Sequence, residues 1–248
     1  MIKVSNLTKS YSTRKGSFSV SNLDLTVNDS AVTALLGTNG SGKSTIIKAI
    51  CGIHYPNSGS IILTDKNKKE YEISKNLEIA KDLIGFVPES PYLPGNMRVK
   101  DFLTFAAATH ALSGKEAEKA ISRCIKDCAL SDFLTAPIKT LSKGQQQRVS
   151  FAQALIHNPP NLVLDEPISG LDPAQIIQMR QLIEELASEK AVLMSTHILQ
   201  EVYSTCSSIY IIKAGQVICK GSEEEITKAT GTSKLEDAFL KLSGGSLE

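Results

Sequence analysis

The chain has 248 residues, with 27 Lys and Arg against 26 Asp and Glu, so its formal net charge at pH 7 is +1. Such a balance gives no electrostatic reason for binding nucleic acid, and we expect no nucleic-acid partner. Apolar residues make up 42% of the chain and charged residues 21%, which is typical of a globular protein and excludes a disordered one. Aromatic residues reach 5% and Trp is absent, so a stacking surface for single strands is not expected.

Three features bear on cellular location. The N-terminal segment, MIKVSNLTKSYS, lacks the apolar stretch of a secretory signal. The best membrane candidate, residues 102–112, is much shorter than the ~20 apolar residues that a spanning helix needs. The five cysteines are scattered along the chain, as is typical of reduced thiols. We therefore expect a cytoplasmic protein.

The first third of the chain predicts short strands around a glycine-rich turn. Strands are expected at 2–7, 31–36 and 82–87, with a half-buried alternating pair over 18–27 that follows a polar turn at 12–16. From Ser44 the apolar spacing becomes helical, and Gly52 predicts the end of that helix. Residues 53–82 predict small strands and an edge loop.

The middle of the chain is helical, and an α/β alternation resumes after it. Helical spacing over 97–135 predicts an insertion at 90–155 between two halves of an α/β core, 1–89 and 156–242. The later elements are strands at 162–164, 191–194 and 209–212, helices at 173–189, 222–229 and 234–242, and a flexible tail at 243–248. We predict one α/β domain with a helical subdomain.

A phosphate-binding loop follows the strand at 31–36. The segment matches G-x-x-x-x-G-K-[ST] at each fixed position, between an expected strand and an expected helix. Its glycines let consecutive N–H groups point at phosphate oxygens, and the helix adds its positive N-terminal end. Lys43 would reach the β- and γ-phosphates of ATP or GTP, and the Ser44 hydroxyl would bind Mg²⁺. The predicted nucleotide-binding set is Gly37, Thr38, Asn39, Gly40, Ser41, Gly42, Lys43, Ser44 and Thr45.

A pair of carboxylates ends a later apolar run, Leu162-Val-Leu-Asp165-Glu166. Neighbouring strand residues point to opposite faces, so the two acids are expected to have different roles. Asp165 suits a Mg²⁺ site, and Glu166 could take a proton from an attacking water. Such a run could also be a solvated strand end, but a phosphate-binding loop needs a carboxylate for its metal.

The segment Leu141-Ser142-Lys143-Gly144-Gln145 resembles the LSGGQ signature of the ATP-binding-cassette (ABC) ATPases. Motifs similar to those of this family follow in the family's order at 37–45, 86–89, 141–145, 162–166, 169–172 and 195–197. The resemblance implies a P-loop nucleoside triphosphate hydrolase core with an N-terminal antiparallel β subdomain and an inserted α-helical subdomain. It also implies ATP hydrolysis with Mg²⁺ between two paired ATPase subunits.

The signature segment has a physical interpretation of its own. Ser142 followed by Gln145 is a capping-box pattern that opens a helix, and such an end can bind an anion or serve only as a cap. The resemblance implies that Ser142, Gly144 and Gln145 contact the γ-phosphate of ATP held by another subunit. Lys143 stands where the family has glycine, and its side chain could attract phosphates or point to solvent.

Four further residues gain roles from the resemblance. Asp172 before Pro173 reads as a helix N-cap, and the family implies a D-loop along the dimer seam. His197 after a strand could be structural, and the family implies a γ-phosphate sensor that fixes the water and Glu166. Tyr11 stands where the family has an aromatic residue that stacks on adenine. Glu89 replaces the family's glutamine, and we expect it to keep the role of Mg²⁺ ligand.

Two segments, 97–103 and 235–242, resemble one branch of the family, the bacterial exporter ATPases of multidrug and gliding-motility type. That branch implies export through a separately encoded transmembrane permease, a second ATPase subunit that we expect to be another copy of this chain, and a peripheral place on the cytoplasmic face of the membrane. The alternative is a soluble, non-transport ABC ATPase in assembly, repair or translation. Such relatives usually carry two cassettes or a long coiled coil.

Overall fold

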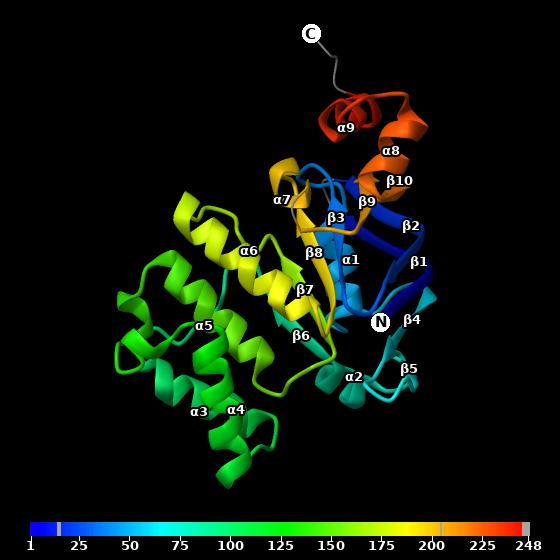
Figure 1. Cartoon of the computed structure of the whole chain (residues 1–248). Helices are drawn as coiled ribbons and strands as arrows, with labels where there is room; N and C mark the ends of the chain where they lie inside the picture. Colours follow the sequence, from blue (N-terminus) through cyan, green and yellow to red (C-terminus); the bar gives the residue numbers. More distant parts are fainter. Residues whose placement is uncertain (14–15, 204, 245–248) are drawn as a thin grey trace.

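The computed structural model of the chain describes residues 1–13, 16–203 and 205–244 (Figure 1). They form two sheets, with helices packed between and around them. Within this described part, no helix is both long and apolar enough to cross a membrane.

The larger sheet has the strand order β10-β9-β3-β8-β7-β6. All neighbours are parallel except the antiparallel pair β9–β10. The strands are β3 (Ala31–Leu36), β6 (Ile84–Val87), β7 (Asn161–Asp165), β8 (Ala191–Thr196), β9 (Ser208–Lys213) and β10 (Gln216–Gly221). Every residue of β7 and β8 is buried, as expected of parallel strands covered on both faces. The parallel strands bring their carboxyl ends to one edge, where the predicted motifs other than the signature segment follow.

The smaller sheet is antiparallel, with the order β2-β1-β4-β5. Its strands are β1 (Ile2–Thr13), β2 (Gly16–Val27), β4 (Ser58–Thr64) and β5 (Glu70–Glu72). The helix α1 (Lys43–Ile50) joins the two sheets, because its Ile46, Ile47 and Ile50 are fully buried in one cluster with Leu63 and Leu193. This packing anchors the first turn of α1 and therefore the loop before it.

The chain between β6 and β7 forms α3 (Val99–Thr109), α4 (Gly114–Asp127) and α5 (Lys143–Leu155), with two short 3₁₀ turns. Figure 1 shows these helices gathered on one side of the larger sheet. Their apolar faces share a cluster with Val87 and Leu164 of that sheet. The limits 90–155 for a separate subdomain stay a prediction.

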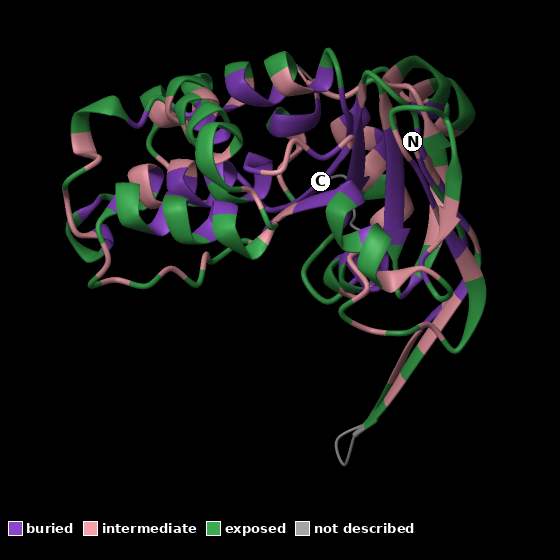
Figure 2. Ribbon diagram, turned by 90° about the horizontal axis from the view of Figure 1, so that it is seen from below, coloured by how far each residue is buried: buried purple, intermediate pink, exposed green. Residues whose placement is uncertain are grey.

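Four helices of the second half of the described chain also pack on the larger sheet. They are α6 (Pro173–Ala187), α7 (Leu199–Tyr203), α8 (Glu223–Thr230) and α9 (Leu235–Ser243). Figure 2 shows the buried residues along the strands and on the inward helix faces, with exposed residues on the outside. Val202, Ile226 and Leu235 pack with Ile211 of β9 in a third apolar cluster.

The α/β class with an antiparallel N-terminal sheet is confirmed, and several local predictions are wrong. Residues 77–83 form the helix α2 (Leu77–Leu83), so Asp82 is helical. With only Ala80 and Leu83 buried, this helix is too short to show a period. Residues 18–27 lie within one strand, and α7 and β10 were not expected. Residues 14–15 of the predicted turn at 12–16 lie outside the described residues. So do residues 245–248 of the predicted tail at 243–248, whose first residue, Ser243, is the last residue of α9.

Candidate nucleotide-binding site

The predicted phosphate-binding loop connects β3 to α1. The Gly37 amide donates a hydrogen bond to the Thr196 carbonyl at 3.3 Å, which ties the start of the loop to the end of β8. At the N-cap of α1, Gly42 has φ of 116°, in the left-handed region that favours glycine. A β-carbon there would also lie 3.1 Å from the Phe18 ring and 3.2 Å from Val20. The sequence therefore has glycine where the backbone requires it.

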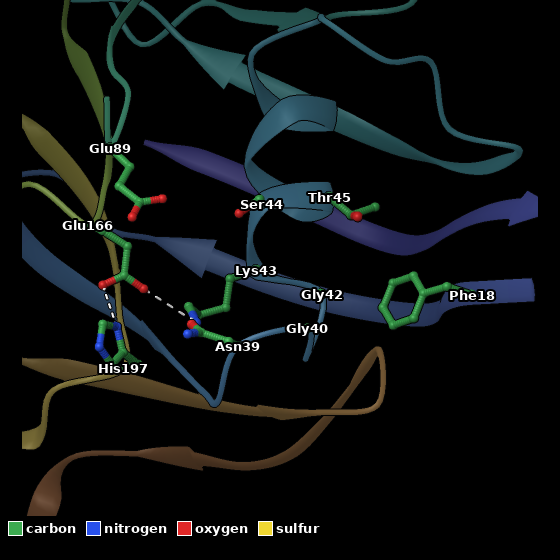
Figure 3. Close-up of a pocket in the computed structure, with 10 residues that line it drawn as sticks. All are labelled: Phe18, Asn39, Gly40, Gly42, Lys43, Ser44, Thr45, Glu89, Glu166 and His197. Carbon is green, nitrogen blue, oxygen red and sulfur yellow. Dashed lines mark hydrogen bonds and ion pairs between the residues drawn. The ribbon is translucent and has the colours of Figure 1, made fainter. Parts of the chain in front are cut away.

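A pocket of about 370 Å³ opens beside this loop, and its lining brings several predicted site residues together. Figure 3 shows Glu89, Glu166 and His197 on one side of the loop and Phe18 on the other. The lining residues are Phe18, Asn39, Gly40, Gly42, Lys43, Ser44, Thr45, Glu89, Glu166 and His197. Residues far apart in the sequence thus meet at the carboxyl edge of the larger sheet.

Lys43 is only 6% exposed, and its ammonium group lies between the loop and Glu166. It donates hydrogen bonds to the carbonyls of Gly37 at 2.7 Å and Thr38 at 3.3 Å. Its Nζ is 3.4 Å from Glu166 Oε1 (Figure 3). A buried cation beside the mouth of a glycine-rich loop is suited to bind an anion such as a nucleotide phosphate.

Glu166 is oriented by its backbone and by His197. Its φ of 49° lies in the left-handed region, which is strained for a residue with a side chain. Its amide donates to the Ser195 carbonyl at 3.2 Å, and His197 Nδ1 donates to Glu166 Oε2 at 2.7 Å (Figure 3). The predicted Glu166–His197 pair is therefore present as a direct hydrogen bond.

Ser195 is a site residue that the sequence analysis did not single out. Its hydroxyl donates to Asp165 Oδ1 at 2.6 Å and accepts from the Glu166 amide at 3.1 Å. Asp165 and Ser195 are paired in the β7–β8 ladder, so the register places the hydroxyl between the two acids. In the sequence, the only indication of its role is its position two residues before His197. That position indicates a site residue only when the pairing of β7 with β8 is known.

The signature segment begins α5, and its capping box is present. The Ser142 amide donates to Gln145 Oε1 at 2.9 Å, and the Gln145 amide donates to Ser142 Oγ at 3.3 Å. Neither residue lines the pocket, and neither does Gly144. A β-carbon on Gly144 would lie 2.4 Å from Gln175 Oε1, so α5 and α6 approach closely there.

The predicted D-loop begins α6 and touches the signature segment. Asp172 is the N-cap of α6, because its Oδ1 accepts from the Gln175 amide at 2.9 Å. Lys143 Nζ lies over Gly170, where a β-carbon would be 2.4 Å from it. The lysine that departs from the family pattern thus packs on the loop before Asp172.

Tyr11 is outside the lining of the pocket, whereas Phe18 is part of that lining. The two residues are partners in the β1–β2 ladder. The Tyr11 ring makes an edge contact with His54, with the ring centroids 5.9 Å apart, and Lys9 Nζ lies 5.3 Å from its centroid. Phe18 has no sequence signal of its own, because the loop approaches it only in the fold.

A sequence profile of the family described as ABC transporter matches residues 20–169, more than half of the chain. The chain belongs to the ABC transporter family. Among its relatives, the uncharacterized ABC transporter ATP-binding protein YxlF of Bacillus subtilis is 33% identical over 233 residues, which cover 94% of this chain and 75% of that protein.

Solved structures of ABC ATPases are also similar. An ATP binding subunit of an ABC transporter has a TM-score of 0.83 at 28% identity, covering 98% of this chain and 99% of that one. The dimeric structure of a post-hydrolysis state of the cassette MJ0796, bound to ADP and Pi, has a TM-score of 0.78 at 27% identity, covering 90% and 98%. This ABC protein binds ATP and is an ATPase.

The residues around the pocket fit a magnesium ion held partly by nucleotide. No group of three or more His, Cys, Asp or Glu side chains that could bind a metal occurs in the described part of the chain. Mg²⁺ in nucleotide sites is usually bound by one or two carboxylates, a hydroxyl, waters and phosphate oxygens, so it needs no such group. Ser44 and Glu89 line the pocket. One carboxylate oxygen of Asp165, Oδ1, accepts a hydrogen bond from the Ser195 hydroxyl.

Proposed function

We propose that this ABC ATPase powers export through a separate transmembrane permease, by closing a dimer of two chains around ATP. The observation that carries the proposal is the separation of the predicted ATP contacts. Lys43, Glu166 and His197 meet at one pocket, whereas Ser142 and Gly144 lie outside its lining. In the closed dimer, the signature residues of one chain would face the ATP bound by the other. Ser142, Gly144, Gln145 and Asp172 would then contact ATP across the dimer interface.

Within each pocket, the chain's own residues divide the chemistry. The loop amides, the start of α1 and Lys43 bind the phosphates and offset their charge. Glu166 polarises the attacking water, and its hydrogen bond with His197 holds its carboxylate in place. His197 then lies where it can stabilise the charge that develops on the transferred phosphoryl group.

A magnesium ion in this site would help to neutralise the charge of the β- and γ-phosphates. Ser44, Asp165 and Glu89 are the residues that would hold it. Glu89 adds a carboxylate where the family has a neutral amide, which strengthens attraction for a hard cation. We expect Glu89→Gln to keep ATP hydrolysis and Glu89→Ala to shift its Mg²⁺ dependence; an Ala variant with the parental rate and Mg²⁺ dependence would contradict this role.

The proposed permease contact lies on the helical insertion and the segment after Glu89. Tyr92 is fully exposed there, and Phe105 on α3 is 56% exposed. Exposed aromatic side chains are typical of protein interfaces. The names of relatives as ABC transporter ATP-binding proteins also support transport over a soluble role in assembly, repair or translation. The chain would then be peripheral on the cytoplasmic face of the membrane.

Site-specific photo-crosslinking in cells tests this proposal. A photoreactive phenylalanine analogue replaces either Phe105 or Ile177, which is 57% exposed on α6 and so a matched control. We expect position 105, and not position 177, to crosslink to an integral membrane protein. Crosslinks from position 105 to soluble proteins alone, or equal crosslinking from both positions, would contradict permease docking.

A further inference from the structure

A closed set of hydrogen bonds surrounds the backbone on either side of His197. Thr196, the last residue of β8, is fully buried, and its hydroxyl donates to Glu201 Oε2. The same hydroxyl accepts from the Ile198 amide at 3.0 Å. The residues before and after His197 are therefore tied together through one hydroxyl group, which Glu201 of α7 orients.

The His197 ring itself has little packing to hold it. Its side chain is 40% exposed, and its one hydrogen bond among the described residues is to Glu166. A partly exposed side chain with few contacts depends on a fixed backbone for a defined orientation. The bonds through Thr196 supply that restraint, and the Thr196 carbonyl also accepts from Gly37 at the start of the phosphate-binding loop.

Glu201 is an unusual residue to bury at this place. Its side chain is buried, and within the described residues no Lys, Arg or His nitrogen lies within 4.0 Å of its carboxylate. Burial raises the pKa of Glu201 and the charge of Glu166 adds to this rise, whereas the Thr196 hydroxyl, His197 and Arg180 lower the pKa. A buried carboxyl group with no cationic nitrogen in direct contact is costly, so its hydrogen bond to Thr196 is the contact that stabilises it most directly.

We propose that Glu201 is a positioning residue for His197, acting through the hydroxyl of Thr196. Glu201 accepts a hydrogen bond from the Thr196 hydroxyl and so orients this hydroxyl to accept a hydrogen bond from the Ile198 amide. These two bonds fix the backbone conformation at His197. The His197 ring then meets Glu166 at hydrogen-bond distance. The inference rests on the proposed roles of Glu166 and His197 in hydrolysis. It adds that these roles depend on a buried carboxyl group that lies outside the lining of the pocket.

Steady-state ATP hydrolysis by the full-length chain tests this. We expect Thr196→Val and Glu201→Ala each to lower kcat by about 10- to 100-fold, because a small misplacement of a catalytic group has effects of that size. The KM for ATP should change by less than about twofold, because Lys43 and the loop amides are unchanged. The double variant should be no slower than the slower single variant, since both changes break the same bond.

Two further variants keep the outcome decisive. Thr196→Ser retains the hydroxyl and should keep a kcat near that of the parent. Thr64→Val removes a buried strand hydroxyl in the other sheet and should leave kcat unchanged. Thermal melting shows whether Glu201→Ala folds. If it does not, the Thr196 and Thr64 variants are sufficient to test the proposal.

The proposal is overturned if Thr196→Val has the parental kcat, if Thr196→Ser is as slow as Thr196→Val, or if the two single effects add in the double variant. A rise in KM that accounts for the whole loss would also overturn it. Failure of the underlying function has a different signature, because Glu166→Gln would then hydrolyse ATP at the parental rate.

Discussion

Two buried lysines at opposite edges of the larger sheet show what distinguishes a ligand site from a structural one. Lys43 and Lys190 are both 6% exposed. Lys43 lies at the carboxyl edge, between two loop carbonyls and Glu166. Lys190 lies at the amino edge, just before β8, and donates to Asn158 Oδ1 and the Pro159 carbonyl, both at 2.8 Å.

The partners of the two lysines differ in kind. Lys190 has only neutral acceptors, and no carboxylate lies within 4.0 Å of its Nζ among the described residues. Burial, with smaller effects of the positive charges of Lys66 and Arg123, lowers the pKa of Lys190 to about 8. Lys43 instead lies in a pocket with the phosphate-binding loop and with Glu166, which provides both a carboxylate and a backbone in the left-handed region. Burial alone therefore does not identify a functional cation, whereas those neighbours do.

The largest expected effect separates the two lysines directly. Lys43→Met should weaken ATP binding by at least about 30-fold, because losing one partner of a buried charged contact costs about 2 kcal/mol or more. Lys190→Met should leave the Kd for ATP within about twofold. Titration calorimetry with ATP measures both. Equal losses in the two variants would break the comparison.

A pH titration sharpens the structural side of the comparison. At the amino edge, His157 stacks on His110 with ring centroids 3.8 Å apart, and His157 Nε2 donates to the Ile84 carbonyl at 3.2 Å. Burial, with a smaller effect of His110, lowers the pKa of His157 from 6.5 to about 4. Its neutral form is favoured in the folded state, so its contribution to stability is present above pH 6.5 and lost as the pH falls towards 4.

This loss should reach at most about 3 kcal/mol, given 1.36 kcal/mol for each pKa unit. Urea unfolding of the parent and of His157→Gln between pH 7 and pH 4 measures it as a difference. The variant should lose less stability over that range. Parallel curves for the two proteins would show that His157 titrates alike in the folded and unfolded states.

The smallest expected effect concerns the aromatic side chain that would stack on the adenine of ATP. Base stacking on an aromatic ring contributes about 1–3 kcal/mol. Phe18 lines the pocket and Tyr11 does not, although the two are ladder partners. We propose that Phe18→Ala weakens ATP about fivefold or more and that Tyr11→Ala has a smaller effect, as measured by fluorescence titration with a labelled nucleotide. The reverse order would restore Tyr11 as the stacking residue.

Sequence reasoning succeeded where a local pattern has a local cause. The glycine-rich loop, the capping box at Ser142 and the N-cap at Asp172 each depend on residues a few positions apart. It failed for α2, whose single buried stripe is too short to show a period. It also missed Ser195 and Phe18, because their places at the site depend on strand pairing between distant segments.

The central claim is that two chains close around ATP and that Glu166 is needed for hydrolysis. Size-exclusion chromatography of Glu166→Gln with saturating ATP, beside its ATPase rate, tests this most directly. The account predicts retained ATP binding, turnover lowered by about 100-fold or more, and elution as a dimer that returns to monomer without ATP. Turnover at the parental rate, or a monomer under saturating ATP, would contradict it.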